Sequence, residues 1–186
     1  MTCFHVASVS WNADAPRVWS LARARGRRTG WAAFALVVCA AVTACGRKPP
    51  SPSSAETVVF VCPHGSAKSV LAAALFEERA KARGLPHRAL ARGIDPDPAL
   101  APAVVAGLAA DGRQPTVAAP ARFVAEEARG AGRVVTFGPL PAALTEGAVV
   151  ETWESTPSVT RAYAAARDDM IARIDALLDA LERTRR

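Results

Sequence analysis

Residues 57–69 read Thr-Val-Val-Phe-Val-Cys-Pro-His-Gly-Ser-Ala-Lys-Ser, and this run joins a strand to the start of a helix. The consecutive apolar residues at 58–61 predict a strand of a parallel sheet that is buried on both faces. Cys62 stands where that strand ends, and an alanine-rich helix is expected from 67 to 83, closed by Gly84. A strand, a tight loop and a helix N-terminus together favour anion binding. Cys62 is therefore expected to face a bound anion.

Strands alternate with helices through the rest of this region. Further strands are predicted at 87–91, 132–137 and 148–152, the first of them weak and close to a sheet edge. Helices are predicted at 98–110, 120–129 and from 156 or 158 to 181, with a short helical turn or loop at 139–145. We expect Asp97 to cap the helix that begins at Pro98. The alternation predicts an α/β domain with a parallel sheet, whose ligands bind beyond the carboxyl ends of the strands.

The N-terminal segment has the order of a secretory signal. A basic cluster at 23–28 precedes a short apolar run at 31–43, which falls below the roughly 20 residues that span a bilayer. The next residues, Val42-Thr43-Ala44-Cys45, resemble a bacterial lipobox. We expect residues 1–44 to be removed and Cys45 to carry diacylglycerol, which would attach the chain to a membrane of the bacterial cell envelope, facing the periplasm or the exterior. An uncleaved anchor and a buried helix are the alternatives. Residues 45–56, rich in Pro and Ser, are predicted to form an extended tether before a domain at 57–186.

The charge of the chain is misleading when it is taken as a whole. The net charge is +6, but residues 1–44 hold five arginines and one aspartate, so only +2 belongs to the mature chain. That chain has no basic stripe and few aromatic residues, so nucleic acid is not an expected partner. No metal or cofactor is expected either.

The cysteine count singles out one thiol. The four cysteines are Cys3, Cys39, Cys45 and Cys62. Cleavage would remove the first two and lipid would occupy the third, which leaves Cys62 without an internal disulfide partner. Such a thiol in an exported protein is either a reactive group or a small buried hydrophobe.

The loop after Cys62 supplies the expected oxyanion contacts. Its backbone N–H groups and the helix dipole would surround the anion and favour the thiolate form of Cys62. A thiolate in that position can attack phosphorus in line. Lys68 would neutralise phosphate charge, and Ser69 could donate a hydrogen bond to the sulfur. The expected oxyanion-binding residues are Pro63, His64, Gly65, Ser66, Ala67 and Lys68.

These residues resemble the active-site loop of the low-molecular-weight phosphotyrosine phosphatases and of the arsenate reductases that share their fold. That family has a strand, Cys, five residues, Arg, Ser and then a helix, and Cys62 and Ser69 fall in register. Ala91-Arg92-Gly93 is similar to the family's turn after the second strand, and 133–137 to its third strand. The resemblance implies a three-layer α-β-α, flavodoxin-like fold with a four-stranded parallel sheet in the order 2-1-3-4. It also implies phosphate, a similar oxyanion or a phosphorylated substrate as the partner.

Three positions depart from the family pattern. Lys68 replaces the arginine, so charge is kept but the planar two-pronged grip on phosphate is lost, at a cost of a few kcal/mol in the transition state. Gly65 replaces the asparagine that shapes the loop. Thr156, before Pro157, replaces the aspartate that acts as general acid, and Glu154 is the only nearby carboxylate that could substitute for it.

Three functional readings follow from the sequence. The favoured one is a phosphatase-like protein that binds an oxyanion while its catalysis is weak or lost. The second is an active phosphotyrosine hydrolase with Cys62 as nucleophile, Lys68 and Ser69 assisting and Glu154 as a doubtful acid. The third is a structural protein in which Cys62 has no role. An arsenate reductase would need an external thiol, because no cysteine follows Cys62.

Overall fold

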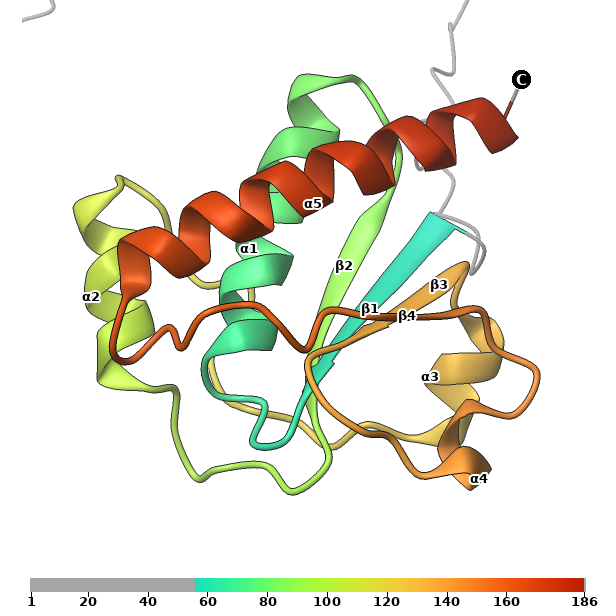
Figure 1. The fold of residues 1–186 in the computed structure, drawn as a ribbon, viewed down its shortest axis with the longest axis horizontal. Coiled ribbons are helices and arrows are strands. Elements are labelled where there is room, and N and C mark those ends of the chain that lie inside the picture. Colours follow the sequence, from blue (N-terminus) through green and yellow to red (C-terminus); the bar gives the residue numbers. More distant parts are fainter. Residues whose placement is uncertain (1–55, 186) are drawn as a thin grey trace, which may run out of the picture. The chain divides into compact units, whose positions relative to one another are not determined.

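The computed structural model describes residues 56–185 of the chain. This region is a parallel sheet with helices on both faces (Figure 1). In chain order the elements are β1 (Thr57–Cys62), α1 (Lys68–Ala82), β2 (Arg88–Gly93), α2 (Pro102–Ala110), α3 (Ala125–Gly130), β3 (Arg133–Thr136), α4 (Ala142–Thr145), β4 (Val150–Thr152) and α5 (Tyr163–Thr184).

The predictions for the N-terminus fall outside this region. The signal peptide at 1–44, Cys45 and the tether up to residue 55 lie outside the described residues, so the lipid anchor stays a prediction. Within the described region, no helix is both long and apolar enough to cross a membrane.

The sheet has four parallel strands in the order β2-β1-β3-β4. β1 pairs with β2 on one side, where Cys62 stands opposite Gly93, and with β3 on the other. β4 pairs only with β3, where Thr136 stands opposite Thr152. The predicted flavodoxin-like α/β fold and its strand order are therefore confirmed. All four strands end at the same edge, the lower one in Figure 1.

Alternate residues of β1 face two different helical layers, as the two-residue period of a strand requires. Val58, Phe60 and Cys62 belong to the larger core, which α1 and α5 cover. Val59 and Val61 belong to the smaller core on the other face, together with Phe123. The run of apolar residues is continuous because both faces of β1 are buried. The same alternation sends the Cys62 side chain to the face that carries α1.

Ion pairs hold α5 against α1. Arg79 on α1 and Arg83, which caps its C-terminus, both donate to Asp175 on α5, with Nε of Arg79 at 2.7 Å from Oδ1. The hydrogen bond from Arg79 is the largest influence on Asp175 and keeps the pKa of its carboxyl below the usual value, although burial acts in the opposite direction. The contact fixes the helix that follows the Cys62 loop relative to the C-terminal helix.

The predicted start of the second helix is wrong. α2 begins at Pro102 rather than Pro98, and Asp97 is not its cap. Residues 94–101 instead run alongside the loop after β1. The amides of Asp95, Asp97 and Ala101 donate to carbonyls of that loop at 2.9–3.0 Å. Backbone pairing between two loops therefore replaces the first turn of the expected helix.

Other boundaries shift for similar reasons. α3 begins at Ala125 rather than 120, because residues before it extend the sheet: the amide of Phe123 donates to the carbonyl of Gly93 at 2.8 Å. α5 begins at Tyr163 rather than at 156 or 158, since the segment before it is a loop at the carboxyl edge of the sheet. β2 lies one to two residues later than expected, and β3 and β4 are shorter.

Candidate functional site

Cys62 ends β1 at the carboxyl edge of the sheet and is 5% exposed. Two polar groups contact its sulfur. The backbone N–H of Gly65 donates to Sγ at 3.2 Å, and the hydroxyl of Ser69 lies 3.3 Å from Sγ. Both groups can donate a hydrogen bond to this sulfur. The sequence predicts that Ser69 can donate to the sulfur, and its hydroxyl does lie within hydrogen-bonding distance of Sγ.

The loop owes its shape to two glycines in contact. Gly65 has φ +64°, and a Cβ at this position would lie 2.8 Å from the amide nitrogen of Gly93. A Cβ on Gly93 would in turn meet the backbone of residues 64 and 65 at 2.6–2.9 Å. The loop can curl over the sulfur only because neither residue carries a side chain.

We expect Gly65→Ala to destabilise the fold by about 3 kcal/mol, the sum of about 1–2 kcal/mol for a left-handed backbone and a similar amount for the clash with Gly93. Gly112→Ala is the matched control, because Gly112 has φ +72° but open space around it. That control should cost only about 1 kcal/mol. Urea unfolding of the two variants measures the difference, and equal losses would show that the contact with Gly93 is unimportant.

Lys68 occupies the first position of α1, at the end of the loop. Its ammonium donates to the backbone carbonyl of Thr156 at 2.7 Å and lies 5.9 Å from the centre of the Phe137 ring. The positive charge is therefore held on the side of the β4–α5 loop. Thr156 is itself 3% exposed, so this contact lies beneath the surface.

The carboxylate of Asp169 on α5 interacts electrostatically with the Lys68 ammonium. Burial acts to raise the pKa of Asp169, but the hydrogen bond from Arg173 and the charges of Arg173 and Lys68 together hold it below its usual value. Asp169 is therefore ionised at neutral pH, and its negative charge offsets part of the positive charge of Lys68.

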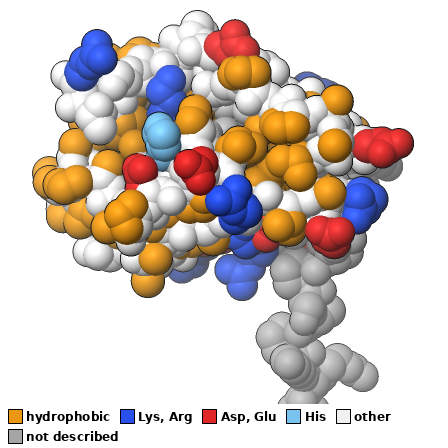
Figure 2. Space-filling model, turned by 90° about the horizontal axis from the view of Figure 1, so that it is seen from below, with side chains coloured by type: hydrophobic (Ala, Val, Ile, Leu, Met, Phe, Trp, Pro, Cys, Tyr) orange, Lys and Arg blue, Asp and Glu red, His pale blue; other side chains and the backbone are white. Residues whose placement is uncertain are grey.

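A cavity of about 310 Å³ is lined in part by Cys62. Figure 2 looks onto this edge of the molecule, where charged and hydrophobic side chains are interspersed. One wall comes from the Cys62 loop, and the opposite wall from the segments after β2 and β4. The lining residues are Cys62, Pro63, His64, Ser66, Ala67, Lys68, Asp97, Ala101, Ser158, Val159 and Thr160.

The structure thus brings together most of the residues that the sequence singled out. Gly65 and Ser69 contact the sulfur from beneath and do not line the cavity. Glu154 is exposed and is not among the lining residues, so the cavity gives it no contact. Sequence reasoning did not place Asp97, Val159 or Thr160 at the site. The repeated Asp-Pro pair at 95–98 was a signal, but it was interpreted as a turn and a helix cap.

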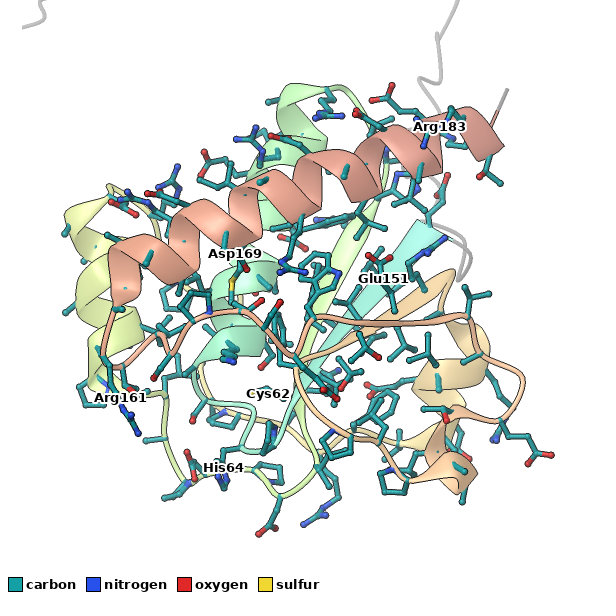
Figure 3. The ribbon with its side chains drawn as sticks, viewed as in Figure 1. Cys62, His64, Glu151, Arg161, Asp169 and Arg183 are labelled. Carbon is teal, nitrogen blue, oxygen red and sulfur yellow. The ribbon has the colours of Figure 1, made fainter. Side chains whose placement is uncertain are left out.

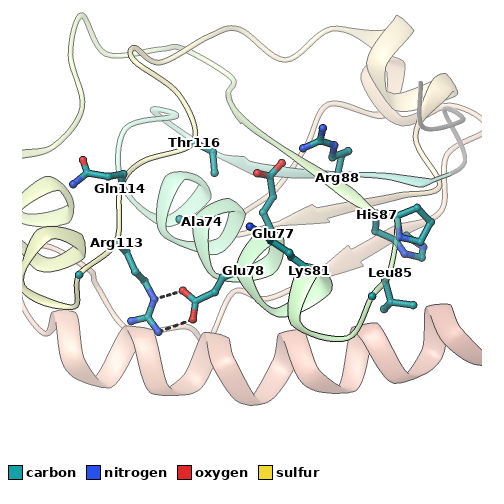
Figure 4. Close-up of a pocket in the computed structure, with 13 residues that line it drawn as sticks. Ala74, Glu77, Glu78, Lys81, Leu85, His87, Arg88, Arg113, Gln114 and Thr116 are labelled. Atoms are coloured by element: carbon teal, nitrogen blue, oxygen red, sulfur yellow. Dashed lines mark hydrogen bonds and ion pairs between the residues drawn. The ribbon is translucent and has the colours of Figure 1, made fainter. Parts of the chain in front are cut away.

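A larger hollow of about 700 Å³ lies elsewhere, between α1 and the segments at 84–88 and 112–116 (Figure 4). Its most prominent charges neutralise each other, since Arg113 donates to both carboxylate oxygens of Glu78 at 2.5 and 3.0 Å. Among the described residues that line it, none is a cysteine or a serine.

No protein-family description and no curated protein matches the chain by sequence. Solved structures do match it in fold. The YwlE arginine phosphatase of Bacillus subtilis, in a mutant form with a phosphorylated active-site serine, aligns with a TM-score of 0.59 at 19% identity, over 68% of this chain and 95% of that one. A low-molecular-weight protein tyrosine phosphatase from Bacillus subtilis gives 0.56 at 19% identity, over 70% and 99%.

An arsenate reductase in the phosphate-binding state gives a TM-score of 0.54 at 16% identity, over 67% of this chain and 97% of the other. Because these chains are aligned over nearly their whole length, the region 56–185 has the fold of low-molecular-weight tyrosine phosphatases and arsenate reductases. The resemblance inferred from the Cys62 loop is confirmed at the level of the fold.

Proposed function

We propose that this chain is a phosphatase-like protein that binds phosphate or a similar oxyanion on the Cys62 loop and hydrolyses phosphate monoesters slowly. The observation that carries the proposal is the position of the Cys62 sulfur. Cys62 lines a cavity, and the Gly65 amide and the Ser69 hydroxyl lie 3.2 and 3.3 Å from its sulfur. The fold neighbours add support, because one is described as carrying a phosphorylated active-site serine and another as binding phosphate.

The proposed reaction begins with attack of the Cys62 thiolate on phosphorus. The bond between phosphorus and the leaving oxygen breaks, and a phosphocysteine forms. The amide of Gly65 and the hydroxyl of Ser69 stabilise the sulfur when it is negative, before attack and after hydrolysis. Water then releases phosphate and restores the thiolate. The loop residues 63–68 are the proposed contacts of the phosphoryl oxygens, as the sequence indicates.

Slow turnover follows from the charges around the cavity. Besides His64, the lining holds one lysine and one aspartate, and the charge of Asp97 opposes that of Lys68 in binding a phosphate dianion. Lys68 is also bonded to the carbonyl of Thr156, which takes one of its three donors away from the anion. A lysine lacks the planar fork that grips two phosphate oxygens at once. Binding should therefore survive better than transition-state stabilisation.

We expect the full chain to hydrolyse p-nitrophenyl phosphate and to be inhibited competitively by inorganic phosphate and by orthovanadate. Both anions should fill the cavity above Cys62 and exclude the ester. The measurement is a steady-state assay at several inhibitor concentrations. Hydrolysis that phosphate and vanadate leave unchanged would contradict an oxyanion site on this loop.

A further inference from the structure

A histidine and an aspartate form a pair at the rim of the Cys62 cavity. His64 lies on the loop after β1 and Asp97 on the segment after β2, and both line the cavity. The Nδ1 atom of His64 is 3.7 Å from Oδ1 of Asp97. Figure 3 shows His64 at the same edge of the sheet as Cys62. The carboxylate therefore faces one particular nitrogen of the imidazole ring.

Asp97 is held in place by contacts that do not involve the imidazole. Its other oxygen, Oδ2, accepts a hydrogen bond from the hydroxyl of Ser66 at 2.5 Å, and its amide donates to the carbonyl of His64 at 3.0 Å. Oδ1 remains available to the ring. When a carboxylate engages Nδ1, the proton that the ring gives or takes is the one on Nε2.

The reaction needs a proton donor that the expected positions do not supply. Thr156 has no acidic proton at neutral pH, and Glu154 is exposed and does not line the cavity. An imidazole gains and loses a proton near neutral pH, which suits it to this role.

We infer that His64 is the general acid of the Cys62 reaction and that Asp97 is the residue that positions its ring. The inference rests on the proposed function. As the Cys62 thiolate forms its bond to phosphorus, the bond to the leaving oxygen breaks, and Nε2–H of His64 gives its proton to that oxygen. The alcohol departs and the ring is left neutral. In the second step the neutral ring takes a proton from the attacking water, so that phosphate leaves and both the thiolate and the imidazolium are restored.

The test compares two esters that differ in their need for a proton. Phenyl phosphate has a poor leaving group, and 2,4-dinitrophenyl phosphate has a good one. His64→Asn keeps an amide near the Nδ1 position and removes Nε2. It should lower kcat/KM about 100-fold for phenyl phosphate, and by less than about threefold for the dinitrophenyl ester. Asp97→Asn should show the same selectivity with a smaller loss, about tenfold for phenyl phosphate.

Asp95→Asn is the matched control, because Asp95 belongs to the neighbouring Asp-Pro pair, is largely exposed and pairs with Arg122 outside the cavity. It should change neither rate. If His64→Asn lowers kcat/KM equally for both esters, the inference is overturned, and the His64–Asp97 pair only stabilises the loop. A selective loss in Glu154→Gln instead would also overturn it. If the wild-type chain hydrolyses neither ester, the proposed function has failed. If the wild type hydrolyses both esters but His64→Asn loses the same factor for each, only the role of His64 has failed.

Discussion

Cys62→Ser is expected to lower kcat for p-nitrophenyl phosphate by at least about 1,000-fold, the scale on which loss of a nucleophile acts in other covalent enzymes. A serine hydroxyl stays protonated at neutral pH and is a weak nucleophile, whereas a thiol forms its anion far more readily. The steady-state rate of the purified variant measures the effect. Phosphate should still protect the variant against thermal unfolding, because the substitution leaves unchanged the loop amides that are proposed to hold the anion.

Serine is a close match in size for cysteine at this 5%-exposed site, so the variant is expected to fold. Retained phosphate protection on the same sample is therefore the control for a correctly formed loop. A rate that survives the substitution would mean that hydrolysis at this site is not covalent. Loss of both rate and protection would point to a damaged loop instead.

Lys68→Arg is expected to raise kcat about 100-fold, with a much smaller change in KM. A guanidinium can keep a hydrogen bond to the carbonyl of Thr156 and still direct two parallel N–H groups at the phosphoryl oxygens, which the lysine ammonium cannot do. One preorganised donor aimed at developing charge contributes about 2.7–4 kcal/mol in other enzymes, so a gain of this size is what the geometry allows. The same p-nitrophenyl phosphate assay, run beside the wild type, measures the gain in kcat.

Lys81→Arg is the matched control for this gain of activity. Lys81 lies on the same helix, is exposed and stands outside the Cys62 cavity, so its replacement should leave kcat unchanged. An unchanged rate in Lys68→Arg would mean that the lysine is not what limits turnover, and would direct attention to the acid instead.

The sheet could be predicted from the sequence because its signals are local. The apolar run at 58–61 can only be buried on both faces, and the alternation of strands with helices then implies parallel pairing. Cys62, Lys68 and Ser69 follow from the same run, since the end of a strand fixes which edge of the sheet they reach. That edge is where the cavity lies.

What could not be predicted depends on contacts between segments far apart in the chain. Asp97 has good local chemistry for a helix cap. Its carboxylate instead accepts a hydrogen bond from the hydroxyl of Ser66, and its amide donates to the carbonyl of His64, 33 positions upstream. Thr156 and Pro157 resemble a helix start, yet Lys68 ties the carbonyl of Thr156 to a different helix. Such tertiary hydrogen bonds outweigh a local preference of about 1 kcal/mol.

The central claim is that Cys62 carries the phosphoryl group, and trapping of that intermediate tests it most directly. The full chain is mixed with 2,4-dinitrophenyl phosphate, quenched within milliseconds and analysed by peptide mass spectrometry. We predict a mass gain of one phosphoryl group on the peptide that contains Cys62, and its disappearance when the ester is exhausted. Release of dinitrophenol without any phosphorylated Cys62, or with the phosphoryl group on another residue, would contradict the account.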